Sequence, residues 1–334
     1  MRTVTTPEAG RRMWSSGCAA CGGKRVAGAA RAADDRGMAL HEDEVPAGEA
    51  VVRGLLVAQC PEWAELPLSR AGAGTDNTMY RLGDELLVRM PRRPFTAGML
   101  VKERHWLPRL APHLTVAIPE PVHEGAPTDA FPLPWSVYRW IDGDEAGPGT
   151  VRDWGAFGRD LAEFVNELHG TDLMGATRDG DLSWYRGGLL RDCDDWVSPG
   201  FAACEGLVSD VPTLERLWRE ALTLPDPVAP HTWLHADLKP TNLLVRDGAL
   251  HAVIDFAGIA VGFPDAEHAP VWDLPPEARD AYWNVTGLDD LTWQRARAWA
   301  IAPGVSGLSY YRESFPEFAE ECRARLESII AGAR

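Results

Sequence analysis

The chain of 334 residues has no long apolar segment and very little lysine. No run of 18 apolar residues occurs, so the sequence predicts no membrane-spanning helix. An arginine pair at 11–12 lies near the N-terminus, but serine and glycine follow it in place of an apolar stretch, so we expect no secretory signal. Three lysines stand against thirty arginines, a bias that supports no functional interpretation.

Cysteine is also scarce, with six residues scattered along the chain. Only Cys18 and Cys21 form a C-x-x-C pair. A structural zinc site needs about four ligands, and no second cysteine pair or histidine pair lies near this one. The sequence therefore predicts reduced thiols and a cytoplasmic protein, because a disulfide framework belongs to oxidising compartments.

Basic residues are fewer than acidic ones, 33 against 49, which gives a net charge of −16. Residues 1–37 hold seven basic and three acidic residues, which leaves 26 basic against 46 acidic residues in the remainder. Nucleic acid is excluded as an expected partner of that acidic body, because phosphate binding needs basic patches. An acidic body attracts a cationic small molecule. Solubility alone explains the acidity equally well, and the sequence does not predict the oligomeric state.

The composition changes near residue 38. Residues 1–37 are rich in alanine, glycine, arginine and serine, and we predict a disordered extension there because such a segment buries too little apolar surface. Residues 38–140 predict an antiparallel sheet lobe, with Pro67 placing the first strand at an edge. Helices are expected at 49–60 and at 97–107, where Pro108 ends the second one. The expected strands are 66–71, 78–82, 85–90 and 135–141.

Residues 141–334 predict a mainly helical lobe. The segment 153–168 carries apolar residues at a 3.6-residue period, which is typical of an amphipathic helix. Further helices are expected at 213–222, 276–283, 291–301 and 316–331. The fold class is therefore predicted to be α+β, with two lobes.

The most informative motif lies in this second lobe. Residues 235–242 read H-A-D-L-K-P-T-N, which fits the H-x-D-L-x-x-x-N catalytic loop of kinases. Asp255 follows 13 residues after Asn242, within I-D-F. Asp237 can accept a hydroxyl proton, and Asn242 and Asp255 offer the hard oxygen ligands that suit Mg²⁺ beside ATP phosphates. A polar loop with incidental carboxylates is the alternative, but apolar runs on both sides favour a buried, ordered site.

The chain resembles the aminoglycoside phosphotransferase family, the small-molecule branch of the protein-kinase-like fold. The family's loop usually reads H-G-D-x-x-x-x-N and its metal motif I-D-F or I-D-W, so Ala236 replaces a glycine. Residues 263–268 lie where D-P-x-x-D-L is usual, with Phe263 for the first acid and Glu267 for the second. Further similarity covers segments 73–83, 103–108 and 134–140, so the resemblance runs from about residue 40 to the C-terminus.

This resemblance implies further site residues, each with a structural alternative. Arg89 stands where protein kinases have the V-A-I-K lysine, and Glu103 would pair with it; an ordinary ion pair is the alternative. His235 is expected to hold the loop by hydrogen bonds. Lys239 would contact the γ-phosphate, or be a solvated surface residue. Small residues at Gly72 and Gly74 would let backbone N–H groups approach phosphate.

The implied function is phosphoryl transfer from ATP, with GTP as an alternative, to a hydroxyl of a small molecule. Adenine should meet backbone groups near Arg139 and Ile141. Aminoglycosides, macrolides, choline-like alcohols and sugars are all open as acceptors. A protein kinase is a second hypothesis, but no A-P-E motif follows Asp255. A nucleotide-binding regulatory protein is a third hypothesis, and the joint presence of Asp237, Asn242 and Asp255 argues against it.

Overall fold

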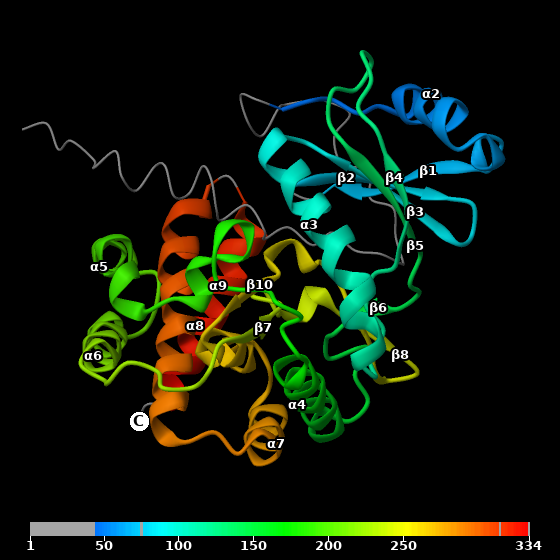
Figure 1. Ribbon diagram of the computed structural model, residues 1–334. Helices are drawn as coiled ribbons and strands as arrows, with labels where there is room; N and C mark the ends of the chain where they lie inside the picture. Colours follow the sequence, from blue (N-terminus) through cyan, green and yellow to red (C-terminus); the bar gives the residue numbers. More distant parts are fainter. Residues whose placement is uncertain (1–43, 74–75, 314, 333–334) are drawn as a thin grey trace, which may run out of the picture.

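The computed structural model describes residues 44–73, 76–313 and 315–332 of the chain. The predictions for residues 1–37, for the Cys18–Cys21 pair and for Gly74 lie outside the described residues. Figure 1 shows two lobes, a sheet lobe formed by the first part of the chain and a helical lobe formed by the rest. The predicted two-lobed α+β architecture is confirmed, whereas the exact boundary between residues 140 and 141 stays a prediction.

The sheet lobe contains one antiparallel sheet in the order β1-β2-β3-β5-β4. Its strands are β1 (Leu68–Ala73), β2 (Asn77–Leu82), β3 (Leu86–Pro91), β4 (Pro121–Gly125) and β5 (Trp135–Arg139). β1 follows Pro67 and forms an edge, as expected. Sequence reasoning missed β4, the other edge strand, which is short and only partly buried.

Two helices accompany the sheet, α2 (Glu49–Gln59) and α3 (Pro94–Leu110). The prediction that Pro108 ends the second helix was wrong, since α3 continues through it to Leu110. Proline in a helix removes one hydrogen bond to the preceding turn. Here the loss falls in the last turn, and Leu107 and Leu110 are both fully buried, so packing outweighs the lost bond.

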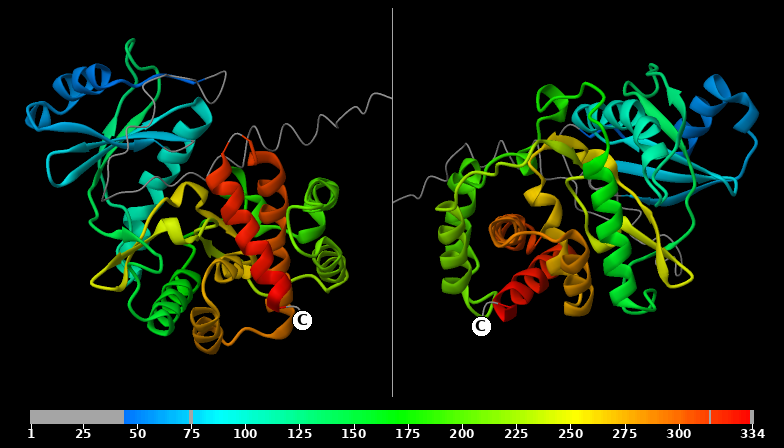
Figure 2. Two further views of the ribbon diagram at one scale, coloured as in Figure 1. Left: turned by 180° about the vertical axis from the view of Figure 1, so that it is seen from behind. Right: turned by 60° about the horizontal axis from the view of Figure 1, so that its bottom comes forward.

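The helical lobe is built mainly from six helices in the described part of the chain. They are α4 (Trp154–Gly170), α5 (Asp194–Ala203), α6 (Val211–Leu222), α7 (Pro276–Thr286), α8 (Asp290–Tyr311) and α9 (Pro316–Gly332). The long helices α8 and α9 lie side by side (Figure 2), and α4 packs against α7. None of the described helices is long and apolar enough to cross a bilayer.

The helical lobe differs from the predicted helices in two places. The helix expected to end at 301 continues past Pro303 to Tyr311, and α5, which contains Pro199, was not predicted at all. Residues Ala298 to Leu308 are all buried, so tertiary packing fixes this part of α8 against its propensity.

Short strands carry the kinase-like motif between the lobes. β7 (Thr232–Leu234) pairs with β10 (Ala260–Gly262), and β8 (Leu243–Arg246) lies between β6 (Asp144–Glu145) and β9 (Ala249–Val253). Residues 235–242 connect β7 to β8, and Asp255 follows β9. The topology therefore brings the two halves of the motif to the same ends of neighbouring strands.

Candidate active site

His235 begins the loop and is completely buried. Its Nδ1 atom accepts a hydrogen bond from the Asp237 N–H at 3.1 Å, and its Nε2 atom lies 3.0 Å from the Ile254 carbonyl oxygen. Nδ1 is therefore the acceptor and Nε2–H the donor in a neutral ring. Burial lowers the pKa of His235, which favours that neutral form. Both ring nitrogens hold the loop, in agreement with a positioning role.

Asp237 and Asn242 are joined by hydrogen bonds, and both are buried. The Asn242 Nδ2 atom donates to the Asp237 carbonyl oxygen at 2.9 Å and lies 3.4 Å from its Oδ2 atom. A short 3-10 turn at Pro240–Asn242 brings the two side chains together. Because Nδ2 is the donor in this arrangement, the Oδ1 atom of Asn242 is left as an acceptor that can ligate a cation.

Asp255 adopts a left-handed backbone conformation, with φ of 65°. Such a conformation is uncommon for a residue with a side chain and is often found at functional sites. Its side chain is 37% exposed, and its Oδ1 atom lies 3.6 Å from Nη2 of Arg89. The second carboxylate of the motif is thus accessible and faces a cation from the other lobe.

Arg89 links the two lobes at this point. Its Nη1 atom donates to Oε2 of Glu103 on α3 at 2.6 Å, and the Tyr138 hydroxyl donates to the same oxygen at 3.0 Å. Glu103 is fully buried, and burial raises its pKa while Arg89 opposes that effect. The expected Arg89–Glu103 ion pair is therefore present, and Arg89 also reaches Asp255.

Glu267 supports the catalytic loop from outside the motif. Its carboxylate accepts hydrogen bonds from the N–H groups of His235 and Ala236, each at 2.9 Å. Ala236 has φ of 65°, a conformation that favours glycine. The replacement of the family's glycine therefore costs backbone strain in addition to the volume of one methyl group.

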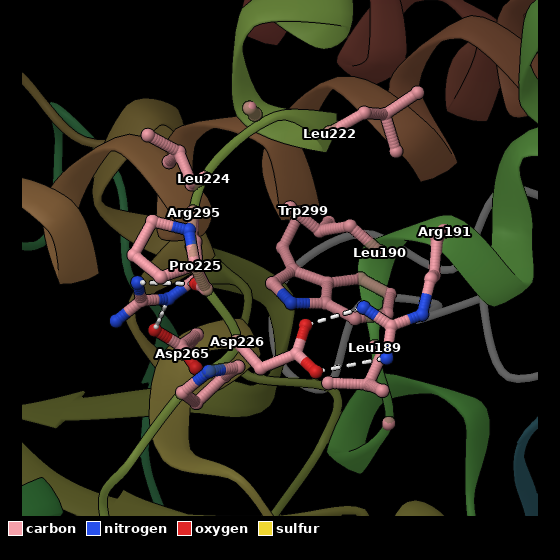
Figure 3. A pocket seen from close by; sticks show the side chains of 13 residues that line it. Leu189, Leu190, Arg191, Leu222, Leu224, Pro225, Asp226, Asp265, Arg295 and Trp299 are labelled. Atoms are coloured by element: carbon pink, nitrogen blue, oxygen red, sulfur yellow. Dashed lines mark hydrogen bonds and ion pairs between the residues drawn. The ribbon is translucent and has the colours of Figure 1, made fainter.

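Asp265 pairs with Arg295 of α8, not with the catalytic loop. The Arg295 Nε atom donates to Asp265 Oδ1 at 2.7 Å, and both side chains are almost completely buried. Figure 3 shows this pair at one end of a pocket and the exposed Arg191–Asp226 pair at the other. The segment after Asp255 is thus held at Glu267 and at Asp265, although Phe263 stands where the family usually has its first acid.

The segment after β5 lies between the lobes. The Arg139 N–H donates to the Glu120 carbonyl oxygen at 2.8 Å, and the Trp140 N–H donates to that of Glu85 at 2.7 Å. Across the described ranges, no acceptor is bonded to the N–H of Ile141. Of the two backbone N–H groups expected near adenine, that of Arg139 is thus engaged, and that of Ile141 has no acceptor among the described residues.

The remaining predicted residues differ in how far the structure places them. Gly72 lies in β1 where the pairing with β2 shifts register, and its partner Gly74 is outside the described residues. Lys239 is 4% exposed and interacts electrostatically with Glu321 of α9. The alternative that Lys239 is a solvated surface residue was therefore wrong, because the residue is buried.

Sequence reasoning missed Arg186. Its Nη1 atom donates to Asp237 Oδ1 at 2.8 Å and to the Ala236 carbonyl oxygen at 2.5 Å. From sequence, the segment 183–191 around it fits an acceptor pocket and simple packing equally well. Arg186 precedes Asp237 by 51 residues, and no fixed spacing connects the two segments. The aromatic and glycine residues around it were the available signal.

Comparison with known proteins gives the family. The model of the phosphotransferase enzyme family (APH) matches residues 67–299. Among curated proteins no sequence matches the chain. The chain is similar to the solved structure of aminoglycoside 2'-phosphotransferase-IIIa in complex with GDP, with 21% identity and a TM-score of 0.67 over 86% of this chain and 100% of that one.

A second solved structure is macrolide 2'-phosphotransferase MphH from Brachybacterium faecium, with 22% identity and a TM-score of 0.53 over 78% of this chain and 91% of that one. At these identities the structures establish the fold, whereas the family model covers well over half of the sequence, including both halves of the motif. The chain therefore belongs to the APH family of phosphotransferases, which transfer phosphoryl groups from a nucleotide to small molecules.

Proposed function

We propose that this enzyme transfers the γ-phosphoryl group of ATP, or of GTP, to a hydroxyl group of a small molecule, with Mg²⁺ as cofactor. The observation that carries the proposal is the position of Arg89, 2.6 Å from Glu103 and 3.6 Å from Asp255. One cation thereby connects the sheet lobe to the motif of the helical lobe. An arginine always carries its charge and can bind phosphate with two N–H groups, so it suits the nucleotide phosphates.

The residues of the loop 235–242 have different roles in the proposed reaction. Asp237 orients the acceptor hydroxyl and accepts its proton, because phosphoryl transfer depends mainly on positioning and charge stabilisation. His235 keeps Asp237 in place through the ring nitrogen that binds its N–H. Lys239 supplies a positive charge toward the γ-phosphate, while Gly72, Gly74 and the segment from Arg139 to Ile141 contact the nucleotide.

Asn242 and Asp255 fit Mg²⁺. Both offer hard oxygen donors, and the Asn242 amide is oriented with its nitrogen on Asp237 and its oxygen available. No group of three or more His, Cys, Asp or Glu side chains in the described ranges could hold a metal by itself. Two protein ligands suit a cation that takes its other ligands from phosphate and water. When bound, Mg²⁺ neutralises charge on the phosphates.

The acceptor class is proposed from the net charge of the chain and from the ligands of similar solved structures. The net charge of −16 favours a cationic acceptor such as an aminoglycoside. Similar solved structures carry kanamycin and gentamicin in their complexes, and another is a macrolide phosphotransferase. We therefore place aminoglycosides first and macrolides second, with choline-like alcohols and sugars after them.

The test is release of ADP or GDP by the purified full chain with Mg²⁺ and each acceptor class in turn. Asp237→Ala should lower turnover about 100-fold or more, as expected for loss of a catalytic base, and should spare nucleotide binding. Asp255→Ala should weaken binding of the Mg²⁺–nucleotide complex. Asp129→Ala, at an exposed loop position, is the matched control. Near-normal activity of both site variants would refute the assignment.

A further inference from the structure

The segment that carries Arg186 is attached to β10, the partner of the strand that leads into the catalytic loop. The Phe263 N–H donates to the Gly187 carbonyl oxygen at 3.0 Å, directly after β10. A Cβ atom at Gly262 would lie 2.4 Å from the Cα atom of Gly187, so only two glycines permit this approach. Because β10 pairs with β7, the backbone beside Arg186 is fixed relative to His235 and Asp237.

The Arg186 side chain is held at both ends of its guanidinium group. Nε donates to the Tyr185 hydroxyl at 2.9 Å, while Nη1 donates to Asp237 Oδ1 at 2.8 Å and to the Ala236 carbonyl oxygen. The Tyr185 ring packs edge-on against Trp196 with ring centroids 5.8 Å apart. Only 15% of the Arg186 side chain is exposed. The Arg186–Asp237 ion pair is therefore buried and held in place by neighbouring side chains, unlike an exposed surface pair.

The contact occupies one oxygen of the candidate base and leaves the other. Oδ1 of Asp237 is bonded to Arg186, whereas among the residues that the structure describes Oδ2 has only the long 3.4 Å approach of Asn242. A carboxylate with one oxygen engaged in a charge-assisted hydrogen bond has a restricted orientation. The second oxygen is thereby presented to an incoming hydroxyl group.

We propose that Arg186 is a positioning residue for phosphoryl transfer, which holds the Asp237 carboxylate through Oδ1 so that Oδ2 receives the acceptor hydroxyl. The inference rests on the proposed function. It adds to the catalytic loop a residue that lies outside the motif and acts through Asp237. Arg191, on the same segment, differs because its partner Asp226 lies away from the loop and both side chains are about half exposed.

The experiment compares Arg186→Gln, Arg186→Ala and Arg186→Lys with the control Arg191→Gln in the full chain. The probe is Mg²⁺–ATP or Mg²⁺–GTP hydrolysis, with water as the hydroxyl acceptor, so no acceptor need be known. We expect kcat to fall about 10- to 100-fold in Arg186→Gln, as small misplacements of catalytic groups do, with KM for the nucleotide unchanged. Arg186→Lys should retain part of kcat, and added guanidinium should restore activity to Arg186→Ala in a saturable way.

The other outcomes would overturn the inference, and one of them would also overturn the proposed function. Unchanged kcat in Arg186→Gln, or an equal loss in Arg191→Gln, overturns the inference while leaving the proposed function intact. Loss of kcat together with a lower melting temperature and no response to guanidinium also overturns it, because that pattern belongs to a structural role. Absence of turnover by the wild-type protein with water and with every acceptor class overturns the proposed function, and the inference with it.

Discussion

Replacement of Glu267 by glutamine tests whether the Glu267 carboxylate holds the catalytic loop in place. The carboxylate accepts two backbone N–H groups, from His235 and Ala236, and is 2% exposed. Burial raises the pKa of Glu267 to about 7, against the opposing effect of those two hydrogen bonds and of Arg186. Glutamine has nearly the same shape but only one acceptor oxygen, so one N–H group would face an NH₂ group.

The contribution of Glu267 to the free energy of unfolding should decrease as the pH rises. The pKa of Glu267 is about 7 in the folded protein and 4.5 as its ordinary value, so the folded state binds this proton more tightly. Its contribution to the free energy of unfolding is fully present below pH 4.5 and is lost as the pH rises through 7. The span corresponds to on the order of 3 kcal/mol. Glutamine does not titrate, so wild-type stability relative to Glu267→Gln should decline over that window.

Activity should change in the opposite direction. Only the ionised carboxylate accepts both N–H groups, and each hydrogen bond to a charged group contributes about 1.5–3 kcal/mol. Protonation therefore loosens the loop that carries Asp237, and wild-type kcat should rise between pH 6 and pH 8 with a midpoint near the Glu267 pKa of about 7. Glu267→Gln should have a low kcat without this rise.

The assay combines nucleotide turnover from pH 6 to 8 with denaturant unfolding from pH 4.5 to 8. Glu163→Gln, at an exposed position of α4, is the control and should match the wild-type protein in both measurements. If Glu267→Gln kept the wild-type rise in kcat, the titrating group would lie elsewhere. If the difference in unfolding free energy were also independent of pH, the argument about Glu267 would be refuted.

Three further variants test other parts of the argument. Ala236→Gly should raise the free energy of unfolding by up to about 1 kcal/mol by relieving the left-handed conformation, and a decrease would contradict that strain. Gly158→Ala should lower stability in thermal unfolding by about 1–3 kcal/mol, because the new Cβ atom would lie 2.2 Å from a backbone oxygen of α7. Gly54→Ala, which meets nothing within 4 Å, is its control and should be neutral or stabilising. Arg89→Met should raise KM for the nucleotide and cost about 3–5 kcal/mol by leaving Glu103 buried and unpaired, and an unchanged KM would restrict Arg89 to a structural role.

The close approach of Asp237 and Asn242 could be predicted because it depends on local spacing. Asp237 and Asn242 lie five residues apart, and a turn of the chain is enough to join them. The lobes followed from the periods of their apolar residues, with α4 as the clearest case. The helix ends expected at 107 and 301 were wrong, because both helices continue through a proline where burial of the surrounding helix outweighs a single lost hydrogen bond.

Arg186 could not be assigned from sequence because its contact depends on the close approach of two glycines. Gly187 and Gly262 are 75 positions apart, and neither is unusual in its own segment. Only the pairing of β10 with β7 shows that they meet beside the loop. A contact of this kind has no periodicity or spacing that a single sequence reveals.

Glu267 is a different case, because elementary hydrogen-bond requirements point toward it. A loop that leaves β7 with a left-handed residue at 236 cannot continue the β-ladder, so its buried N–H groups need another acceptor. A carboxylate on a segment that returns to the same strand is an efficient solution, because its two oxygens can serve consecutive N–H groups. Residues 263–268 form such a segment, since they follow β10, the partner of β7. The second acid of the family's pattern is thus explained by the two N–H groups that it serves, and the aspartate-to-glutamate change at 267 leaves that function intact, since each N–H group is 2.9 Å from its oxygen.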